Sequence, residues 1–129
     1  MTGAAKRRIL VVDDANLVRL YYRDALERAG YAVEEAMNGL EALEKLLTTP
    51  ADLIIVDVNM PQMDGLTFLR ALRRRELPLS ATPALVTSTE AAPADVDAAR
   101  AAGANFYLVK PVAQETLGLY AGMLCGQPA

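Results

Sequence analysis

Residues 53–65 have the sequence LIIVDVNMPQMDG, in which four apolar side chains lead into Asp57 and a turn-rich segment ends at Gly65. Short continuous apolar runs are typical of strands that are buried on both faces, as in a parallel sheet. Pro61 and Gly65 need only be turn formers ahead of the next helix. The stretch therefore predicts a central strand with a carboxylate at its carboxyl end.

Three other apolar runs have the same form and also lead into polar residues. They are residues 9–12 before Asp13 and Asp14, residues 84–86 before Thr87 and Ser88, and residues 106–109 before Lys110 and Pro111. Residues 31–36 form a weaker fifth candidate. We expect five strands.

Helical patterns separate these runs. Apolar or aromatic residues recur at positions 18, 21, 22, 25 and 29, and Gly30 follows as a plausible C-terminal cap. Leucines mark a second helix that must stop before Pro50 and a third over residues 66–72, whose arginines at 70–75 we interpret as a solvated helix end. Residues 94–102, opened by Pro93, and about 114–124 complete the set. Five βα units predict an α/β fold, a parallel sheet with helices on both faces.

Composition narrows the class of protein. The chain has 129 residues, which suits one domain, and 53% of them are hydrophobic. It contains no His, which excludes His-based acid–base catalysis, most zinc sites and Ser-His or Cys-His nucleophile pairs. The net charge of −3 argues against nucleic acid as the main partner.

Cellular location is also indicated. Cys125 is the single cysteine, so no intrachain disulfide forms, and a reducing compartment fits best. The first apolar run is too short for a signal peptide or a membrane span. We therefore expect a cytoplasmic protein without a membrane partner, with a tail at residues 1–7, one domain at 8–125 and a second tail at 126–129.

Chemistry-bearing residues follow four of the five predicted strands. In an open α/β sheet, functional groups gather beyond the carboxyl ends of the strands, so Asp13, Asp14, Asp57, Thr87 and Lys110 should converge. A lone carboxylate there is usually a helix cap, but three beside a hydroxyl and a lysine are harder to explain as caps. One lysine leaves an excess of negative charge, and an all-oxygen site of that kind suits Mg²⁺. The same set suits an incoming phosphoryl group.

Four segments in order carry a resemblance to a known family: VVDD at 11–14, DVNMPQMDG at 57–65, VTST at 86–89 and YLVKP at 107–111. The chain resembles a response-regulator receiver domain of bacterial two-component signalling, and the single-domain, CheY-like chemotaxis type in particular. The resemblance covers residue 8 to about 124. It implies a flavodoxin-like (βα)5 fold, a doubly wound five-stranded parallel sheet with strand order 2-1-3-4-5, and a cis bond before Pro111.

The resemblance also implies roles at the acidic site. Asp57 is the phosphoacceptor, and Lys110 pairs first with Asp57 and then with the phosphoryl oxygens. Asp14, Asp57 and the backbone carbonyl of Asn59 bind Mg²⁺, for which Mn²⁺ can substitute. Asp13 contributes to the metal site mostly through bound water.

Further residues are implied in switching. Thr87 bonds to the phosphoryl group, and Tyr107 resembles an aromatic switch that turns inward as Thr87 shifts; Tyr107 could otherwise be an ordinary half-buried aromatic. Asn59 and Thr89 resemble positions that tune hydrolysis of the acyl phosphate.

The implied function is a signalling domain, not an enzyme acting on a separate substrate, although it catalyses its own phosphorylation and dephosphorylation. A sensor histidine kinase or histidine phosphotransfer protein is the expected donor. A downstream protein is expected to bind the fourth helix, fifth strand and fifth helix, where Ala98, Ala99, Ala101 and Ala102 suggest an exposed Ala-rich patch. We expect a monomer, with a phosphorylation-dependent dimer as the alternative.

Other functions stay open at this point. The domain could be a phosphorelay intermediate or a phosphate sink instead of a chemotaxis regulator. A small phosphatase of the aspartyl-phosphate type is disfavoured, because Asn59 stands where such enzymes favour an acidic group. A flavodoxin-like cofactor binder is disfavoured as well, because Asp13 and Asp14 would repel phosphate after the first strand.

Overall fold

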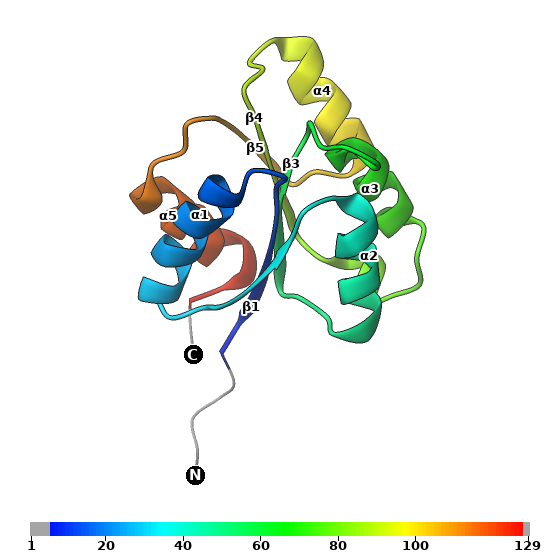
Figure 1. Ribbon diagram of the computed structural model, residues 1–129. Coiled ribbons are helices and arrows are strands. Elements are labelled where there is room, and N and C mark those ends of the chain that lie inside the picture. The colour runs from blue at the N-terminus through cyan, green and yellow to red at the C-terminus, as the bar shows by residue number, and fades with distance from the viewer. Residues whose placement is uncertain (1–5, 128–129) are drawn as a thin grey trace.

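A five-stranded parallel sheet forms the centre of the computed structural model, which describes residues 6–127 (Figure 1). The strands are β1 (Arg8–Val12), β2 (Ala32–Ala36), β3 (Leu53–Asp57), β4 (Ala84–Ser88) and β5 (Phe106–Val109). Their spatial order is β2-β1-β3-β4-β5, and every neighbouring pair is parallel. The predicted α/β class and the 2-1-3-4-5 order are confirmed.

Helices cover both faces of the sheet. They are α1 (Asn16–Arg28), α2 (Gly39–Thr48), α3 (Gly65–Arg73), α4 (Pro93–Ala102) and α5 (Gln114–Cys125). In Figure 1, α1 and α5 lie together on one side, and α2, α3 and α4 lie on the other. Gly30 follows α1 with φ of 103°, which confirms its predicted place after the helix.

Each strand divides its apolar side chains between two cores. Along β1, Ile9 and Val11 pack toward α1 and α5, whereas Leu10 and Val12 pack toward α2, α3 and α4. The central strands β3 and β4 are buried along their whole length. This two-sided burial explains why their sequences show continuous apolar runs instead of alternation.

The edge strands depart from the expectation of two-sided burial. On β5, Phe106 is 42% exposed and Val109 is 45% exposed. Strand β2 has two buried and three half-buried residues. Each of these strands has a neighbouring strand on only one side. The edge position explains the exposure of β5, which its continuous apolar run did not indicate.

The connection from α3 to β4 corrects one prediction. It contains a short 3₁₀ helix at Leu79–Ala81, and Arg73 at the end of α3 folds over it instead of extending into solvent. The Arg73 guanidinium donates to the backbone oxygens of Ser80 (3.0 Å), Thr82 (2.6 Å) and Gly103 (2.8 and 3.1 Å). The interpretation of residues 70–75 as a solvated helix end is therefore wrong for Arg73, because these carbonyls need a donor.

The Ala-rich patch on α4 is also smaller than expected. Ala99 and Ala102 are 1% and 3% exposed and belong to the core on that side of the sheet, whereas Ala98 and Ala101 are exposed. Residues three apart share one helix face, and here that face covers the sheet.

The ends of the predicted domain fall near the limits of the described residues. Most of the predicted tail at 1–7 and residues 128–129 lie outside them, so the tails stay predictions. Near the carboxyl end, the Tyr31 hydroxyl donates to the backbone oxygen of Gly126 at 3.0 Å. Among residues 6–127, no helix is both long enough and apolar enough to cross a membrane.

Candidate functional site

Three carboxylates meet where β1 and β3 end. Val12 and Val56 are register partners, so the residues that follow them emerge side by side. Asp13 is 1% exposed and Asp57 is 7% exposed, whereas Asp14 lies on the surface. One carboxylate oxygen from each of Asp13, Asp14 and Asp57 lies within 4.8 Å of the others. The convergence predicted from the strand ends is present.

Lys110 bridges two of these carboxylates. Its Nζ lies 2.7 Å from Oδ2 of Asp13 and 3.1 Å from Oδ1 of Asp57. Lys110 follows β5, where its N–H donates to the Ser88 carbonyl at 2.8 Å, and the Lys110–Pro111 bond is cis as expected. Burial alone would lower the pKa of Lys110, but its contacts with Asp13 and Asp57 raise the pKa above its usual value. The lysine is therefore charged at neutral pH.

Opposing effects act on the pKa of the Asp57 carboxyl. Burial raises the pKa of its carboxyl above the ordinary value, and the charges of Asp13 and Asp14 act in the same direction. The charge and hydrogen bond of Lys110 lower it. A carboxylate in this position is under-compensated, because one ammonium faces three acidic groups.

The donor set fits a hard divalent cation. Both carboxylate oxygens of Asp13 already accept hydrogen bonds, Oδ1 from the Ala15 N–H at 2.9 Å and Oδ2 from Lys110. Asp14 and Oδ2 of Asp57 accept none from the described residues, so their oxygens are free for a metal ion. This division supports direct ligation by Asp14 and Asp57 and an indirect part for Asp13.

Thr87 lies beside Asp57 on the neighbouring strand. The two residues are register partners, and the Thr87 side chain is fully buried. Its Oγ1 has no hydrogen-bond partner among residues 6–127. A buried hydroxyl without a hydrogen-bond partner costs about 1–3 kcal/mol and commonly has a functional explanation. An arriving phosphoryl oxygen would supply the missing partner.

The remaining predicted residues lie around the acidic site, and no hydrogen bond to its side chains is seen among the described residues. Tyr107 pairs with Val86 across β4 and β5, is half-buried, and donates from its hydroxyl to the Glu90 carbonyl at 2.7 Å. Asn59 and Thr89 are exposed on the loops after β3 and β4. Their roles in switching and hydrolysis stay predictions.

Gly65 has a purpose beyond the turn suggested by its sequence position. Its N–H donates to the Val58 carbonyl at 2.9 Å, which holds the start of α3 against the segment that carries Asn59. A Cβ at this position would lie 2.2 Å from the backbone oxygen of Asp57. Only glycine allows this approach, so Gly65 fixes the backbone directly behind the acidic site.

Two residues of α1 were missed from the sequence. Arg19 is 8% exposed and donates to the Asp13 carbonyl at 2.7 Å and to Glu35 at 2.9 Å, thereby anchoring the loop that carries Asp13 and Asp14. Burial would raise the pKa of Glu35, but Arg19 and Arg23 hold it below its usual value. The second missed residue, Tyr22, is buried and lines the same hollow as Lys110. The helical spacing of residues 18, 22 and 25 places Tyr22 on the inward face of α1, and this spacing was the one sign of its burial in the sequence.

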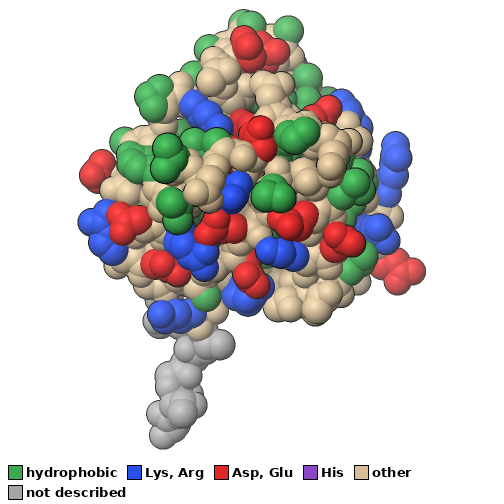
Figure 2. Space-filling view, viewed as in Figure 1, with side chains coloured by type: hydrophobic (Ala, Val, Ile, Leu, Met, Phe, Trp, Pro, Cys, Tyr) green, Lys and Arg blue, Asp and Glu red, His purple; other side chains and the backbone are tan. Residues whose placement is uncertain are grey.

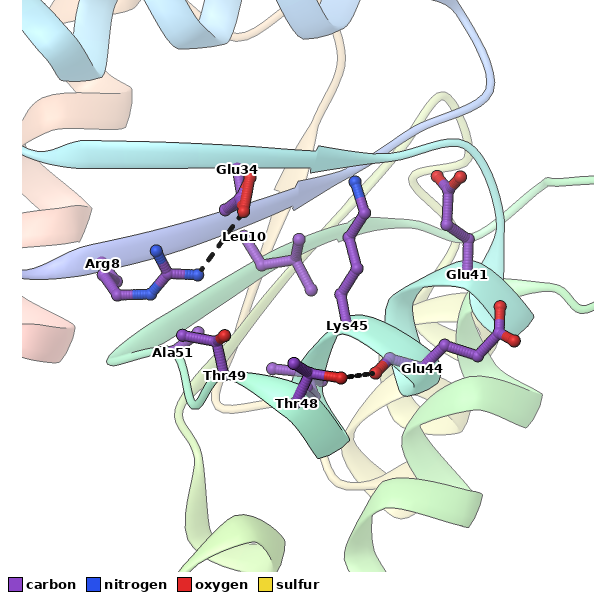
Figure 3. Close-up of a pocket in the computed structure, with 10 residues that line it drawn as sticks. Arg8, Leu10, Glu34, Glu41, Glu44, Lys45, Thr48, Thr49 and Ala51 are labelled. Carbon is purple, nitrogen blue, oxygen red and sulfur yellow. Dashed lines mark hydrogen bonds and ion pairs between the residues drawn. The ribbon is translucent and has the colours of Figure 1, made fainter.

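A separate hollow lies between β1, β2 and α2 (Figure 3). It measures about 400 Å³ and contains Arg8, paired with Glu34 at 3.8 Å, and Lys45, which donates to the Glu35 carbonyl. None of the residues predicted for the acidic site lines this hollow. Its cations already have acceptors, so it offers no comparable phosphoryl site.

Comparison with known proteins settles the family. The model of the response regulator receiver domain matches residues 9–120. This chain is a member of the response regulator receiver family. The segments that carry the acidic site all lie within the matched range.

Several relatives are similar over most of the chain. A two-component response regulator of Oryza sativa, ORR41, is 38% identical over 116 residues, which cover 87% of this chain and 89% of that protein. The chemotaxis protein CheY4 of Vibrio cholerae has a TM-score of 0.87 at 39% identity, covering 93% of this chain and 99% of that structure. A putative response regulator from Chloroflexus aurantiacus has a TM-score of 0.88 at 31% identity, covering 95% and 100%.

Other relatives are longer than this chain. The transcriptional regulatory protein PrrA of Mycobacterium leprae is 38% identical over 110 residues, which cover 85% of this chain but 46% of that protein. The chain thus spans about half the length of some curated relatives.

Proposed function

We propose that this receiver domain accepts a phosphoryl group on Asp57 from a phosphohistidine of a sensor histidine kinase or a histidine phosphotransfer protein. The observation that carries the proposal is the position of the Asp57 carboxylate. It is buried and grouped with the carboxylates of Asp13 and Asp14, paired with Lys110, and the register partner of Thr87, whose hydroxyl has no hydrogen-bond partner among residues 6–127.

The chemical step follows from these contacts. A carboxylate oxygen of Asp57 attacks phosphorus, the bond from phosphorus to the histidine nitrogen breaks, and the imidazole leaves with the electron pair and takes up a proton from water. Lys110 stabilises negative charge on the phosphoryl oxygens, and Thr87 donates a hydrogen bond to one of them. Attack requires ionised Asp57, and the positive charge of Lys110 favours that form.

Asp14, Asp57 and the Asn59 carbonyl would hold Mg²⁺ directly, with Asp13 acting through water, and Mn²⁺ can substitute. When bound, the ion would neutralise charge on the phosphoryl oxygens and on the acidic cluster. The free oxygens of Asp14 and Asp57 support this assignment.

Phosphorylation would shift a two-state equilibrium of the loop after β4 and of Tyr107. The hydrogen bond from the Tyr107 hydroxyl to Glu90 supports this link, because it joins β5 to that loop. The readout would be the surface of α4, β5 and α5, which binds a downstream protein. Asn59 and Thr89 would tune hydrolysis of the acyl phosphate.

We place the domain in the cytoplasm as a monomer, with chemotaxis as its leading role because CheY4 is so similar. A relay intermediate or a phosphate sink is the alternative. Figure 2 shows acidic and basic side chains interspersed on the viewed face, without the broad basic surface that nucleic-acid binding favours.

The test is a phosphotransfer assay. The protein is incubated with a phosphorylated sensor kinase and Mg²⁺, beside the Asp57→Asn variant. We expect label on the parent protein and none on the variant, whereas equal labelling of both would contradict the assignment. Stoichiometric labelling separates this function from an aspartyl-phosphate phosphatase, which would turn over a generic phosphate ester.

A further inference from the structure

Arg19 of α1 connects three parts of the molecule beside the acidic site. Its guanidinium donates from Nη1 to the Asp13 carbonyl at 2.7 Å, from Nη2 to Oδ1 of Asn16 at 3.1 Å, and from Nε to Oε1 of Glu35 at 2.9 Å. These partners belong to the loop after β1, to the start of α1 and to β2. Each nitrogen of the side chain therefore has its own partner, an arrangement that suits the planar fork of an arginine.

The acceptor in the loop is the carbonyl that leads into Asp14. A peptide unit is planar, so a hydrogen bond that fixes the Asp13 oxygen also fixes the nitrogen and the Cα of Asp14. Asp14 is exposed, and its carboxylate accepts no hydrogen bond from the described residues. Its position relative to Asp57 therefore depends on the main chain of the loop, which Arg19 holds.

Glu35 keeps Arg19 in place from the neighbouring strand. Its second oxygen, Oε2, accepts from Arg23, which also donates to the Val33 carbonyl at 2.8 Å. The side chains of Arg19 and Glu35 are 10% and 18% exposed, so water has little access to the pair. Separation of such a pair would leave a charge without compensation, which favours the bonded arrangement.

The charge of Arg19 and its hydrogen bond to the loop act on a bound cation in opposite directions. A positive charge beside a site for Mg²⁺ repels the ion and weakens its binding. The hydrogen bond to the Asp13 carbonyl favours binding if it holds the loop in the geometry that the ion needs. Because the two effects have opposite signs, a measurement of affinity can separate them.

We propose that Arg19 is a positioning residue for the metal site, which holds the peptide between Asp13 and Asp14 so that the Asp14 carboxylate stays beside Asp57 before the ion binds. The inference rests on the proposed function, because it requires Mg²⁺ on these two carboxylates. A loop that is ordered in advance loses less conformational entropy on binding. Removal of Arg19 should therefore weaken Mg²⁺ binding, although it also removes a positive charge.

The test is a titration with Mg²⁺, followed by NMR through the backbone amide resonances of Asp14 and Asp57. We expect Arg19→Met to bind Mg²⁺ about tenfold more weakly than the parent, as is typical when a residue that orients metal ligands is lost. Arg23→Met is the matched control. It removes the same charge and a second partner of Glu35 without touching the Asp13 carbonyl, so it should bind like the parent or slightly more tightly.

Arg19→Lys separates geometry from charge. It keeps the positive charge without the fork, so we expect it to bind Mg²⁺ about threefold more weakly than the parent. This variant also decides the question if Arg19→Met does not fold. Parent-like or tighter binding in either folded variant would overturn the inference, because a merely structural arginine changes stability and not the affinity of the folded protein.

The spectra before Mg²⁺ is added provide a second readout. The Asp14 amide resonance should shift or broaden in both Arg19 variants and stay unchanged in Arg23→Met, since only Arg19 bonds to the preceding carbonyl. An Asp14 resonance that is the same in the parent and in the Arg19 variants would contradict the restraint on the loop.

The two proposals fail in distinguishable ways. If the parent protein binds no Mg²⁺ at Asp14 and Asp57 and accepts no phosphoryl group, the proposed function falls and this inference falls with it. If the parent binds Mg²⁺ and accepts a phosphoryl group but the Arg19 variants bind the ion equally well, the inference alone is refuted.

Discussion

The Asp57 side chain combines burial with negative neighbours, and this combination destabilises its ionised form. Its folded-state pKa is raised, so ionisation of Asp57 opposes folding once the pH exceeds the unfolded value, and the penalty is complete above the folded value. Without Mg²⁺, we expect Asp57→Asn to increase the free energy of unfolding at pH 7, on the order of 1 kcal/mol.

Urea denaturation across pH provides the measurement for Asp57→Asn. The gain should shrink as the pH falls through the folded pKa and vanish below about 4, the ordinary value for an aspartate. A gain that persists unchanged at low pH would show that a packing effect, not the charge, is responsible.

Glycine at position 65 controls how closely α3 approaches the site. In Gly65→Ala, the new Cβ would lie 2.2 Å from the Asp57 backbone oxygen. Relief of this clash requires a shift of the main chain, which costs more free energy than the rotation of a side chain. We expect a loss of about 2–4 kcal/mol in the free energy of unfolding, measured by urea denaturation. Gly118→Ala is the control, because a Cβ there meets nothing within 4 Å, and it should be neutral or stabilise α5 by up to about 1 kcal/mol.

At the scale of elements, Arg73 joins α3 to the 3₁₀ segment and to the end of α4. In Arg73→Met, the carbonyls of Ser80, Thr82 and Gly103 lose a shared donor. We expect a loss of about 2–3 kcal/mol by thermal or urea denaturation. Arg70→Met on the exposed side of α3 should change stability by less than about 0.5 kcal/mol, and equal losses in both variants would contradict the role of Arg73.

The elements themselves were accessible from sequence because buried parallel strands and amphipathic helices leave different periodicities. Strand order was accessible only through the family resemblance, since apolar runs do not say which strands are neighbours. The 3₁₀ segment was missed because residues 76–83 have no helical period. The burial of Arg73 and Arg19 was missed because composition does not reveal which cations fold back onto carbonyls.

The candidate site shows the same division. Its carboxylates, lysine and threonine could be predicted because strand ends in a parallel sheet converge. The spacing of residues 18, 22 and 25 places Tyr22 on the inward face of α1, but an inward aromatic residue on a helix usually serves only the core, so nothing in the sequence connected it with Lys110.

For the whole molecule, metal binding and folding should be linked. The free energy of unfolding should rise with Mg²⁺ by about 2.7 kcal/mol when the ion is at 100 times its dissociation constant. This rise appears as an increase of several degrees in the melting temperature. Asp14→Asn should lose most of it, because Asp14 supplies a free carboxylate. An equal increase in the parent and the variant would point to nonspecific screening.

The most direct test is to locate the phosphoryl group itself. The protein is incubated with phosphoramidate and Mg²⁺, and the acyl phosphate is mapped by peptide mass spectrometry. We predict one phosphoryl group on Asp57, and none when Mg²⁺ is chelated. A phosphoryl group on another residue, or labelling that proceeds equally without the metal ion, would contradict the account.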